Sequence, residues 1–283
     1  MGSDNQKNKL NWEIREYHTE SFGIFFRSGS LLFSGNSPFQ KIEVFANDTF
    51  GKVLLLDGLV QTTEKDEFFY HEMLAHPACA TQPSLDSVLI IGGGDGGTLK
   101  EVLRYPVKRV CHVEIDLDVI SVATKYFPWL SEAQNDERYE LYVEDGAEFL
   151  RRTEEMFDVV LVDSSEPIGP SAALHERPFY ESVMRCLNPG GVIVPQLGSP
   201  FYHLDFINEC VSFFGELFAE PKLYIGPAPT YPGGSWCYGF LSEGTDPFQV
   251  VRTLPPGLKY YTQDIHRAAF VLPAFMIDAT VNS

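Results

Sequence analysis

The chemistry that stands out in the sequence is a carboxylate at the centre of a glycine-rich loop. The loop, residues 92–97 (GGGDGG), follows the apolar run 88–91 and contains Asp95. A glycine loop between a strand and a helix usually binds phosphate, because the helix start offers free N–H groups and a partial positive charge. Asp95 would repel a phosphate at this position. We therefore expect a ligand with a cationic group.

Two more acidic residues follow the next two expected strands. Glu114 ends the run 110–114, 20 residues after Gly94, the spacing at which an acid binds the ribose hydroxyls of a nucleoside. Asp145, next to Gly146, follows the run 141–143 and can accept a hydrogen bond from an adenine amino group. Because ligands of such sheets gather at the carboxyl ends of the strands, the acids predict a nucleoside site. An ordinary charged strand end and an Asp-Gly turn are the alternatives.

The acids favour a positively charged nucleoside, an S-adenosyl sulfonium, over a dinucleotide. A dinucleotide would place its pyrophosphate beside Asp95. Asp95 would also repel the carboxylate of intact S-adenosylmethionine, by about 4 kcal/mol for charges ~4 Å apart at an effective dielectric constant of about 20. A decarboxylated sulfonium, which ends in an amine, would be attracted instead.

Two carboxylates three residues apart are candidates for the reaction itself. Asp163 and Glu166 follow the apolar run 157–162, in a loop stiffened by two prolines and a glycine. Carboxylates at a strand end can bind an amine and deprotonate it. The expected chemistry is an in-line displacement, in which the amine attacks the carbon beside the sulfonium and a neutral thioether leaves. Asp163, nearest the strand end, is the expected base; a polar loop that caps a helix is the alternative.

Alternating strands and helices are expected to position these residues. Strands are expected near residues 88–92, 110–114, 139–143, 157–162, 191–196 and 221–225, and helices near 66–79, 96–104, 117–126, 178–187 and 204–217. This alternation predicts a mostly parallel sheet, to which residues 235–241 add an antiparallel strand. Residues 11–63 are typical of short hairpins that could pair subunits. We expect an N-terminal β-hairpin domain over 1–65, with 1–10 disordered, and a catalytic domain over 66–283.

Composition narrows the class of protein. The chain has 283 residues and a formal net charge of −18, which disfavours nucleic acid and favours polycationic ligands, although solubility alone would also explain it. The polar N-terminus and the lack of a long apolar run predict neither a signal peptide nor a membrane span. The five cysteines stand singly, without zinc-ligand or redox spacing, so we expect reduced thiols, no metal and a cytoplasmic protein.

Short motifs are spread over most of the chain, from residue 12 to 275. They are residues 37–40 (SPFQ), 56–58 (LDG), 61–67 (QTTEKDE), 70–73 (YHEM), 92–97 (GGGDGG), 114–116 (EID), 163–170 (DSSEPIGP), 229–232 (PTYP) and 266–270 (HRAAF). In this order the motifs resemble those of the spermidine synthases, a family of polyamine aminopropyltransferases. The resemblance is specific because no single motif carries it.

The resemblance implies an enzyme that transfers the aminopropyl group of decarboxylated S-adenosylmethionine to putrescine, giving spermidine and 5'-methylthioadenosine without a cofactor. It implies an α/β fold, with a Rossmann-like, methyltransferase-type, mostly parallel sheet and a small N-terminal antiparallel β domain, in a homodimer or homotetramer. Asp163 matches the proton acceptor. Other matching positions are Gln40, Glu114, Asp145, Gly146 and Pro170 for adenosine, His71 and Asp95 for the polyamine or aminopropyl chain, and Tyr70, Gln61, Gln196 and Tyr231 along the crevice.

Two departures from the family pattern bear on the acceptor amine. Glu166 stands where many members have Asp, and Gln196 is followed by Leu197 and Gly198 where many have Gly-Glu. Agmatine, cadaverine and spermidine are therefore alternative acceptors.

Three other kinds of protein are alternatives to an aminopropyltransferase. A small-molecule methyltransferase shares the sheet, the glycine loop and Glu114, but explains Asp95 less well. A nicotinamide dehydrogenase is suggested by the glycine pattern alone. A non-catalytic polyamine-binding protein is disfavoured by the presence of Asp163 and Tyr70.

Overall fold

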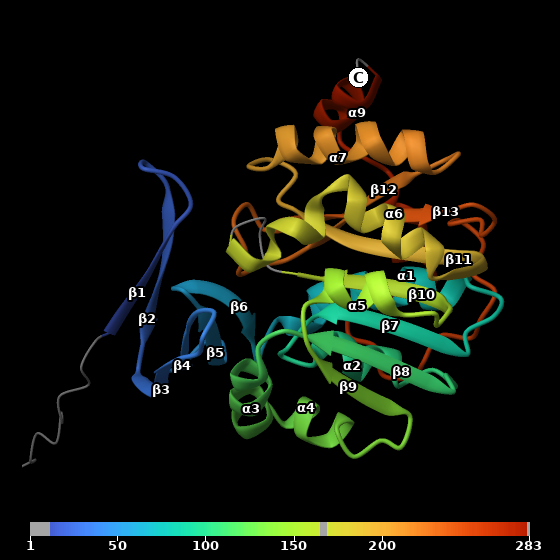
Figure 1. Cartoon of the computed structure of the whole chain (residues 1–283). Helices are drawn as coiled ribbons and strands as arrows, with labels where there is room; N and C mark the ends of the chain where they lie inside the picture. The colour runs from blue at the N-terminus through green and yellow to red at the C-terminus, as the bar shows by residue number, and fades with distance from the viewer. Residues whose placement is uncertain (1–11, 165–168, 282–283) are drawn as a thin grey trace, which may run out of the picture. The chain divides into compact units, whose positions relative to one another are not determined.

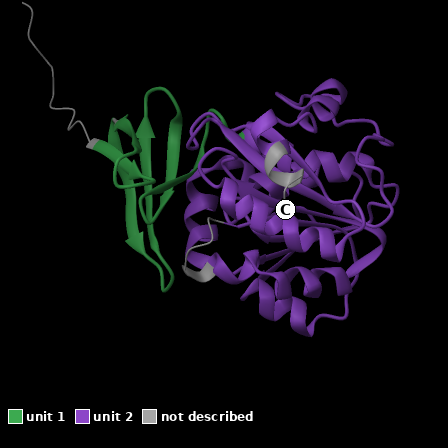
Figure 2. Ribbon diagram, turned by 90° about the horizontal axis from the view of Figure 1, so that it is seen from above, with its two compact units in different colours: residues 1–67 green, residues 68–283 purple. Residues whose placement is uncertain are grey.

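The structure is a computed structural model that describes residues 12–164 and 169–281 (Figure 1). The chain forms two compact units. Unit 1 is Met1–Glu67 and unit 2 is Phe68–Ser283 (Figure 2). The expected domain boundary between residues 65 and 66 stays a prediction.

Unit 1 consists of antiparallel strands joined by short turns. The strands are β1 (Trp12–Tyr17), β2 (Gly23–Ser28), β3 (Ser30–Asn36), β4 (Lys41–Asn47), β5 (Gly51–Leu56) and β6 (Leu59–Thr63). β1 pairs with β2, and β3 to β6 form a second sheet in chain order. Asp57 and Gly58 both have positive φ angles and form the two-residue turn between β5 and β6. The expected N-terminal β region is confirmed.

Unit 2 is built on a seven-stranded sheet. Its strands are β7 (Ser87–Gly92), β8 (Arg109–Glu114), β9 (Tyr139–Val143), β10 (Phe157–Asp163), β11 (Leu187–Gly198), β12 (Lys222–Pro227) and β13 (Ser235–Ser242). Their order across the sheet is β12-β13-β11-β10-β7-β8-β9. All pairings from β9 to β11 are parallel, and β13 is antiparallel to both of its neighbours. The mostly parallel sheet and its added antiparallel strand are therefore confirmed.

Helices connect and cover these strands. They are α1 (Glu67–Thr81), α2 (Gly97–Val102), α3 (Leu117–Tyr126), α4 (Pro128–Ala133), α5 (Gly146–Arg152), α6 (Arg177–Arg185), α7 (Leu204–Leu217), α8 (Gln263–Ala269) and α9 (Ala274–Val281), with the 3-10 helix η1 (Gly169–His175). The sequence pattern does not predict α4, α5, η1, α8 or α9. All five are short, so each shows too few turns of apolar periodicity to stand out.

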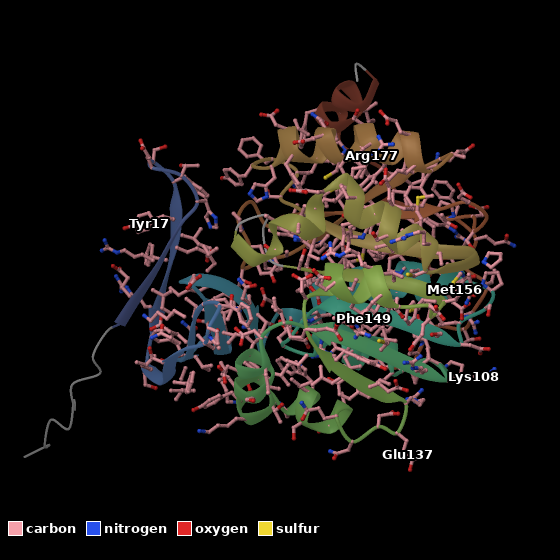
Figure 3. All side chains as sticks on the ribbon, viewed as in Figure 1. Tyr17, Lys108, Glu137, Phe149, Met156 and Arg177 are labelled. Carbon is pink, nitrogen blue, oxygen red and sulfur yellow. The ribbon has the colours of Figure 1, made fainter. Side chains whose placement is uncertain are left out.

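The main core lies between the sheet and α5, α6 and α7. Side chains such as Val160 of β10, Phe149 of α5 and Tyr180 of α6 pack together there. Phe149 is enclosed in this core, whereas Lys108 and Met156 lie on the surface (Figure 3). All five cysteines are free thiols in buried positions. Within residues 12–164 and 169–281, no helix has the length and apolarity needed to cross a bilayer.

Candidate active site

Three acidic side chains gather at the carboxyl edge of the sheet, where the sequence analysis expected them. Glu114 ends β8, and Asp163 ends β10. Asp95 lies in the loop that follows β7, the strand between those two. Asp163 pairs with Gly92, which brings the end of β10 directly beside the glycine loop. The parallel topology therefore assembles the three acids although they are far apart in the sequence.

The glycine loop leaves room for Asp163. A Cβ atom on Gly92 would lie 2.3 Å from the carbonyl oxygen of Asp163, and one on Gly93 would lie 2.6 Å from its Oδ2 atom. Both glycines also have positive φ angles, 78° and 70°, which other residues rarely adopt. A larger residue at either position would push the loop away from the Asp163 carboxylate.

Two hydroxyl groups hold the carboxylate of Asp163. The Tyr70 hydroxyl donates to Oδ1 at 2.7 Å, and the Thr98 hydroxyl donates to Oδ2 at 2.6 Å. Burial raises the pKa of Asp163, and the charge of Asp95 raises it further, whereas His71 and the two hydroxyls lower it. A raised pKa makes a carboxylate a better proton acceptor. Burial also raises the pKa of Tyr70, so its phenol stays protonated and donates.

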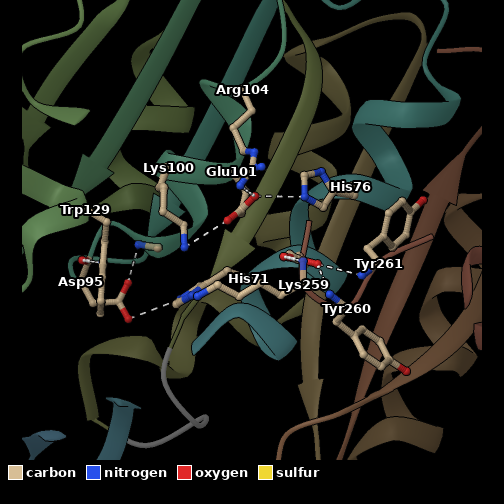
Figure 4. A network of polar contacts seen from close by, with 12 residues as sticks. His71, His76, Asp95, Lys100, Glu101, Arg104, Trp129, Lys259, Tyr260 and Tyr261 are labelled. Carbon is tan, nitrogen blue, oxygen red and sulfur yellow. Dashed lines mark hydrogen bonds and ion pairs between the residues drawn. The ribbon is translucent and has the colours of Figure 1, made fainter. Parts of the chain in front are cut away.

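Asp95 is fixed by contacts to both of its carboxylate oxygens and to its backbone oxygen. Its Oδ1 atom accepts the N–H of Gly97 at 2.8 Å, and its Oδ2 atom lies 3.4 Å from Nε2 of His71. The indole N–H of Trp129 donates to the backbone oxygen of Asp95 at 2.9 Å (Figure 4). A Cβ atom on Gly97 would lie 2.0 Å from Cε1 of His71, so this glycine lets α1 and α2 approach each other.

Glu114 and Asp145 lie at the ends of neighbouring strands. Oε1 of Glu114 accepts the N–H of Asp116 at 2.9 Å. Burial raises the pKa of Glu114 to about 7. Oδ1 of Asp145 accepts the N–H groups of Ala147 and Glu148, so Asp145 caps α5, whose first residue is Gly146.

Aromatic rings and an amide surround the tyrosine that binds Asp163. The ring centroid of Tyr70 lies 5.6 Å from that of Tyr231, which in turn lies 4.7 Å from that of Trp236. Gln196 donates to the backbone oxygen of Ser164 at 2.8 Å and accepts the indole N–H of Trp236 at 2.8 Å. Gln196 therefore ties the residue after Asp163 to β11 and β13.

Four of the expected site residues lie in unit 1, outside the described residues or in η1. Gln40 and Gln61 belong to unit 1, where Gln40 closes a turn with Ser37 and Gln61 lies in β6. Glu166 lies outside the described residues, and Pro170 lies in η1. Their roles stay predictions.

Thr98 and Trp129 also contact the site, although the sequence did not single them out. Thr98 is the second residue of α2, directly after the glycine loop, and this position was the only signal available. Trp129 lies in a short helix that the sequence pattern does not reveal.

Buried polar contacts fix the helix that carries Tyr70 and His71. The carboxylate of Glu72 is 1% exposed and accepts the N–H groups of residues 259–261 at 2.7–2.9 Å. One turn later, Nε2 of His76 lies 3.1 Å from Oε2 of Glu101 in α2 (Figure 4). Contacts to a late chain segment and to α2 therefore hold α1 in place.

Comparisons with known proteins agree with this arrangement. The family model described as the spermine/spermidine synthase domain matches residues 67–250, and the spermidine synthase tetramerisation domain matches residues 12–64. A polyamine aminopropyltransferase of Leptospira biflexa is 44% identical over 256 residues, covering 89% of this chain and 91% of that protein. One from Thermoanaerobacter sp. is 45% identical over 266 residues, covering 93% and 96%.

Solved structures extend the likeness to the whole fold. A spermidine synthase in complex with the transition state analogue AdoDATO superposes with a TM-score of 0.93 at 37% identity, covering 98% of this chain and 97% of that one. The spermidine synthase of Thermotoga maritima gives a TM-score of 0.92 at the same identity and coverage. The chain therefore belongs to the spermine/spermidine synthase family and is an aminopropyltransferase.

Proposed function

We propose that the chain is a spermidine synthase, which transfers the aminopropyl group of decarboxylated S-adenosylmethionine to putrescine with Asp163 as the proton acceptor and without a cofactor. The observation that carries the proposal is the Asp163 carboxylate, which has a raised pKa and accepts hydrogen bonds from Tyr70 and Thr98 at the end of β10. The related spermidine synthase solved with AdoDATO supports a donor of this class.

The acids of the sheet edge suit the donor. Glu114 accepts hydrogen bonds from the ribose hydroxyls, and Asp145 accepts one from the adenine amino group through Oδ2. Asp95, held by Gly97 and Trp129, attracts the ammonium group of the aminopropyl chain and repels the carboxylate of intact S-adenosylmethionine.

The transfer is a single displacement in which Asp163 takes the proton. The acceptor ammonium gives a proton to Asp163, and its nitrogen attacks the aminopropyl carbon that is bonded to sulfur. The carbon–nitrogen bond forms as the carbon–sulfur bond breaks, and sulfur keeps the electron pair. The products are a secondary ammonium and the neutral thioether 5'-methylthioadenosine. The proton acceptor is needed because an alkyl ammonium has a pKa of about 10.4 in the lysine model.

Replacement of the proposed base tests this role. Asp163→Asn keeps the shape of the side chain, so binding of 5'-methylthioadenosine should stay nearly intact, while turnover should fall by roughly 10²–10⁴. Titration calorimetry and steady-state kinetics measure the two effects. The exposed Asp205, in the first turn of α7, gives the matched control Asp205→Asn. Wild-type turnover in Asp163→Asn would refute the role.

The acceptor is tested by offering purified protein and decarboxylated S-adenosylmethionine to single amines. Putrescine should give the product with the highest kcat/KM, read by mass spectrometry. A higher value with cadaverine, agmatine or spermidine would replace putrescine as the acceptor and leave the transfer chemistry in place.

We also propose that the chain assembles into a homodimer or homotetramer in the cytoplasm. The match of residues 12–64 to the spermidine synthase tetramerisation domain supports an oligomer. Light scattering on the purified protein measures the assembled mass, and a monomer at assay concentration would contradict the proposal.

A further inference from the structure

The two oxygens of the Asp163 carboxylate have different surroundings. Oδ2 accepts the hydroxyl of Thr98 at 2.6 Å and lies where a Cβ atom on Gly93 would be only 2.6 Å away. Oδ1 accepts the hydroxyl of Tyr70 at 2.7 Å. Oδ2 therefore faces the glycine loop and the start of α2, whereas Oδ1 faces α1.

We infer that Thr98 is a positioning residue, whose hydroxyl holds Asp163 by Oδ2 so that Oδ1, beside Tyr70, takes the proton of the acceptor amine. The inference rests on the proposed role of Asp163. Thr98 is fully buried in the first turn of α2, so its hydroxyl is fixed by the helix rather than by solvent. Each carboxylate oxygen has two acceptor sites, of which the hydroxyl groups take one each. The glycine loop lies against Oδ2, so the second site of Oδ1 is the one left for the amine.

Thr98 also sets how basic Asp163 is. A hydrogen bond donated to a carboxylate stabilises the charged form and lowers the pKa. In Asp163 this effect opposes burial and the charge of Asp95, which raise the pKa. The other titratable groups that act on Asp163 are Tyr70 and His71 of α1, Glu114 of β8 and Tyr238 of β13. Since these groups stay in place when Thr98 is replaced, a change at Thr98 isolates its hydroxyl.

The test compares Thr98→Val, which keeps the shape and removes the hydroxyl, with Thr98→Ser, which keeps the hydroxyl. We measure the pH dependence of kcat at saturating decarboxylated S-adenosylmethionine and amine. In Thr98→Val the acid limb should move up by about one pH unit, the effect of losing one hydrogen bond to a charged group. In Thr98→Ser the limb should lie at the wild-type position. The Kd for 5'-methylthioadenosine should be the same in all three proteins.

A purely structural role for Thr98 would lower kcat at every pH and leave the acid limb in place. An unmoved limb in Thr98→Val, or an equal shift in Thr98→Ser, would overturn the inference. If Thr98→Val does not fold, Thr98→Ala removes the same hydroxyl and is measured in its place.

Asp163→Asn, measured alongside, separates this inference from the proposed function. Retained turnover in Asp163→Asn would remove the proposed function itself. Lost turnover in Asp163→Asn together with an unmoved limb in Thr98→Val would remove only the role of Thr98.

Discussion

Replacement of Glu114 by Gln should make the protein more stable at neutral pH while it weakens nucleoside binding. Glu114 is 9% exposed, and its carboxylate accepts the N–H of Asp116 while the charges of Asp116 and Asp163 repel it. A buried carboxylate with acidic neighbours favours the neutral form. Gln is close to Glu in shape and carries no charge, so the substitution removes the cost of ionisation and little else.

The pH dependence of the effect follows from the pKa of Glu114. Burial raises this pKa from 4.5 to about 7, which corresponds to about 3 kcal/mol at about 1.4 kcal/mol per pH unit. The folded-state pKa of Glu114 lies above the unfolded one. The stability that the wild-type protein has while Glu114 is neutral is therefore complete below about pH 4.5 and is lost as the pH rises through about 7. The free energy of unfolding of Glu114→Gln, relative to wild type, should therefore rise by up to about 3 kcal/mol between about pH 4.5 and about pH 8.

Denaturant unfolding of the ligand-free protein across this pH range measures the difference. The exposed Glu154 gives the matched control Glu154→Gln, which removes a carboxylate from the surface. If the free energies of unfolding of Glu114→Gln and wild type change with pH in parallel, the reasoning about burial is refuted. Calorimetry with 5'-methylthioadenosine should show weaker binding to Glu114→Gln, and an unchanged Kd would refute the ribose contact.

Two more substitutions test the contacts of the glycine loop. Asp95→Asn should narrow the preference for decarboxylated over intact S-adenosylmethionine by about a hundredfold or more, since a repulsion of about 4 kcal/mol before screening is removed. A competition assay that shows an unmoved ratio would contradict this. Gly97→Ala should lower the free energy of unfolding by about 1–3 kcal/mol and reduce turnover, because its Cβ would lie 2.0 Å from His71. Gly215→Ala is the control in α7, where an added Cβ atom would meet nothing within 4 Å outside its own helix backbone. Denaturant unfolding should show this variant about 0.5–1 kcal/mol more stable than wild type. Equal stabilities of the two alanine variants would contradict the close approach of α1 and α2.

The sheet and its acidic edge could be predicted because the central strands of unit 2 contain compact apolar runs, residues 88–91 in β7 and 159–162 in β10. The expected bounds 139–143, 117–126 and 204–217 match β9, α3 and α7. Parallel topology then places strand ends together, so Asp95, Glu114 and Asp163 could be assigned to one edge without knowledge of any contact.

The rest depends on contacts that no local pattern reveals. The pair Asp145-Gly146 is typical of a turn, yet the Asp145 carboxylate accepts two N–H groups and starts α5. Thr98 matters only through Asp163, 65 residues away in the sequence, and a single threonine forms no motif. Trp129 acts on Asp95 through an indole N–H whose partner is a backbone oxygen. Such partners become visible only when the fold is known.

The carboxylate of Glu72 has a consequence for the order in which the protein is made. Its three N–H donors, residues 259–261, are translated 187–189 residues after Glu72 itself. Until that segment leaves the ribosome, burying α1 would leave a carboxylate without these donors. The helix that presents Tyr70 and His71 is therefore locked only after residue 261 has been made. A nascent chain released before residue 259 should hold the sheet but expose α1 to proteases, so catalytic competence requires that residues 259–261 have been made.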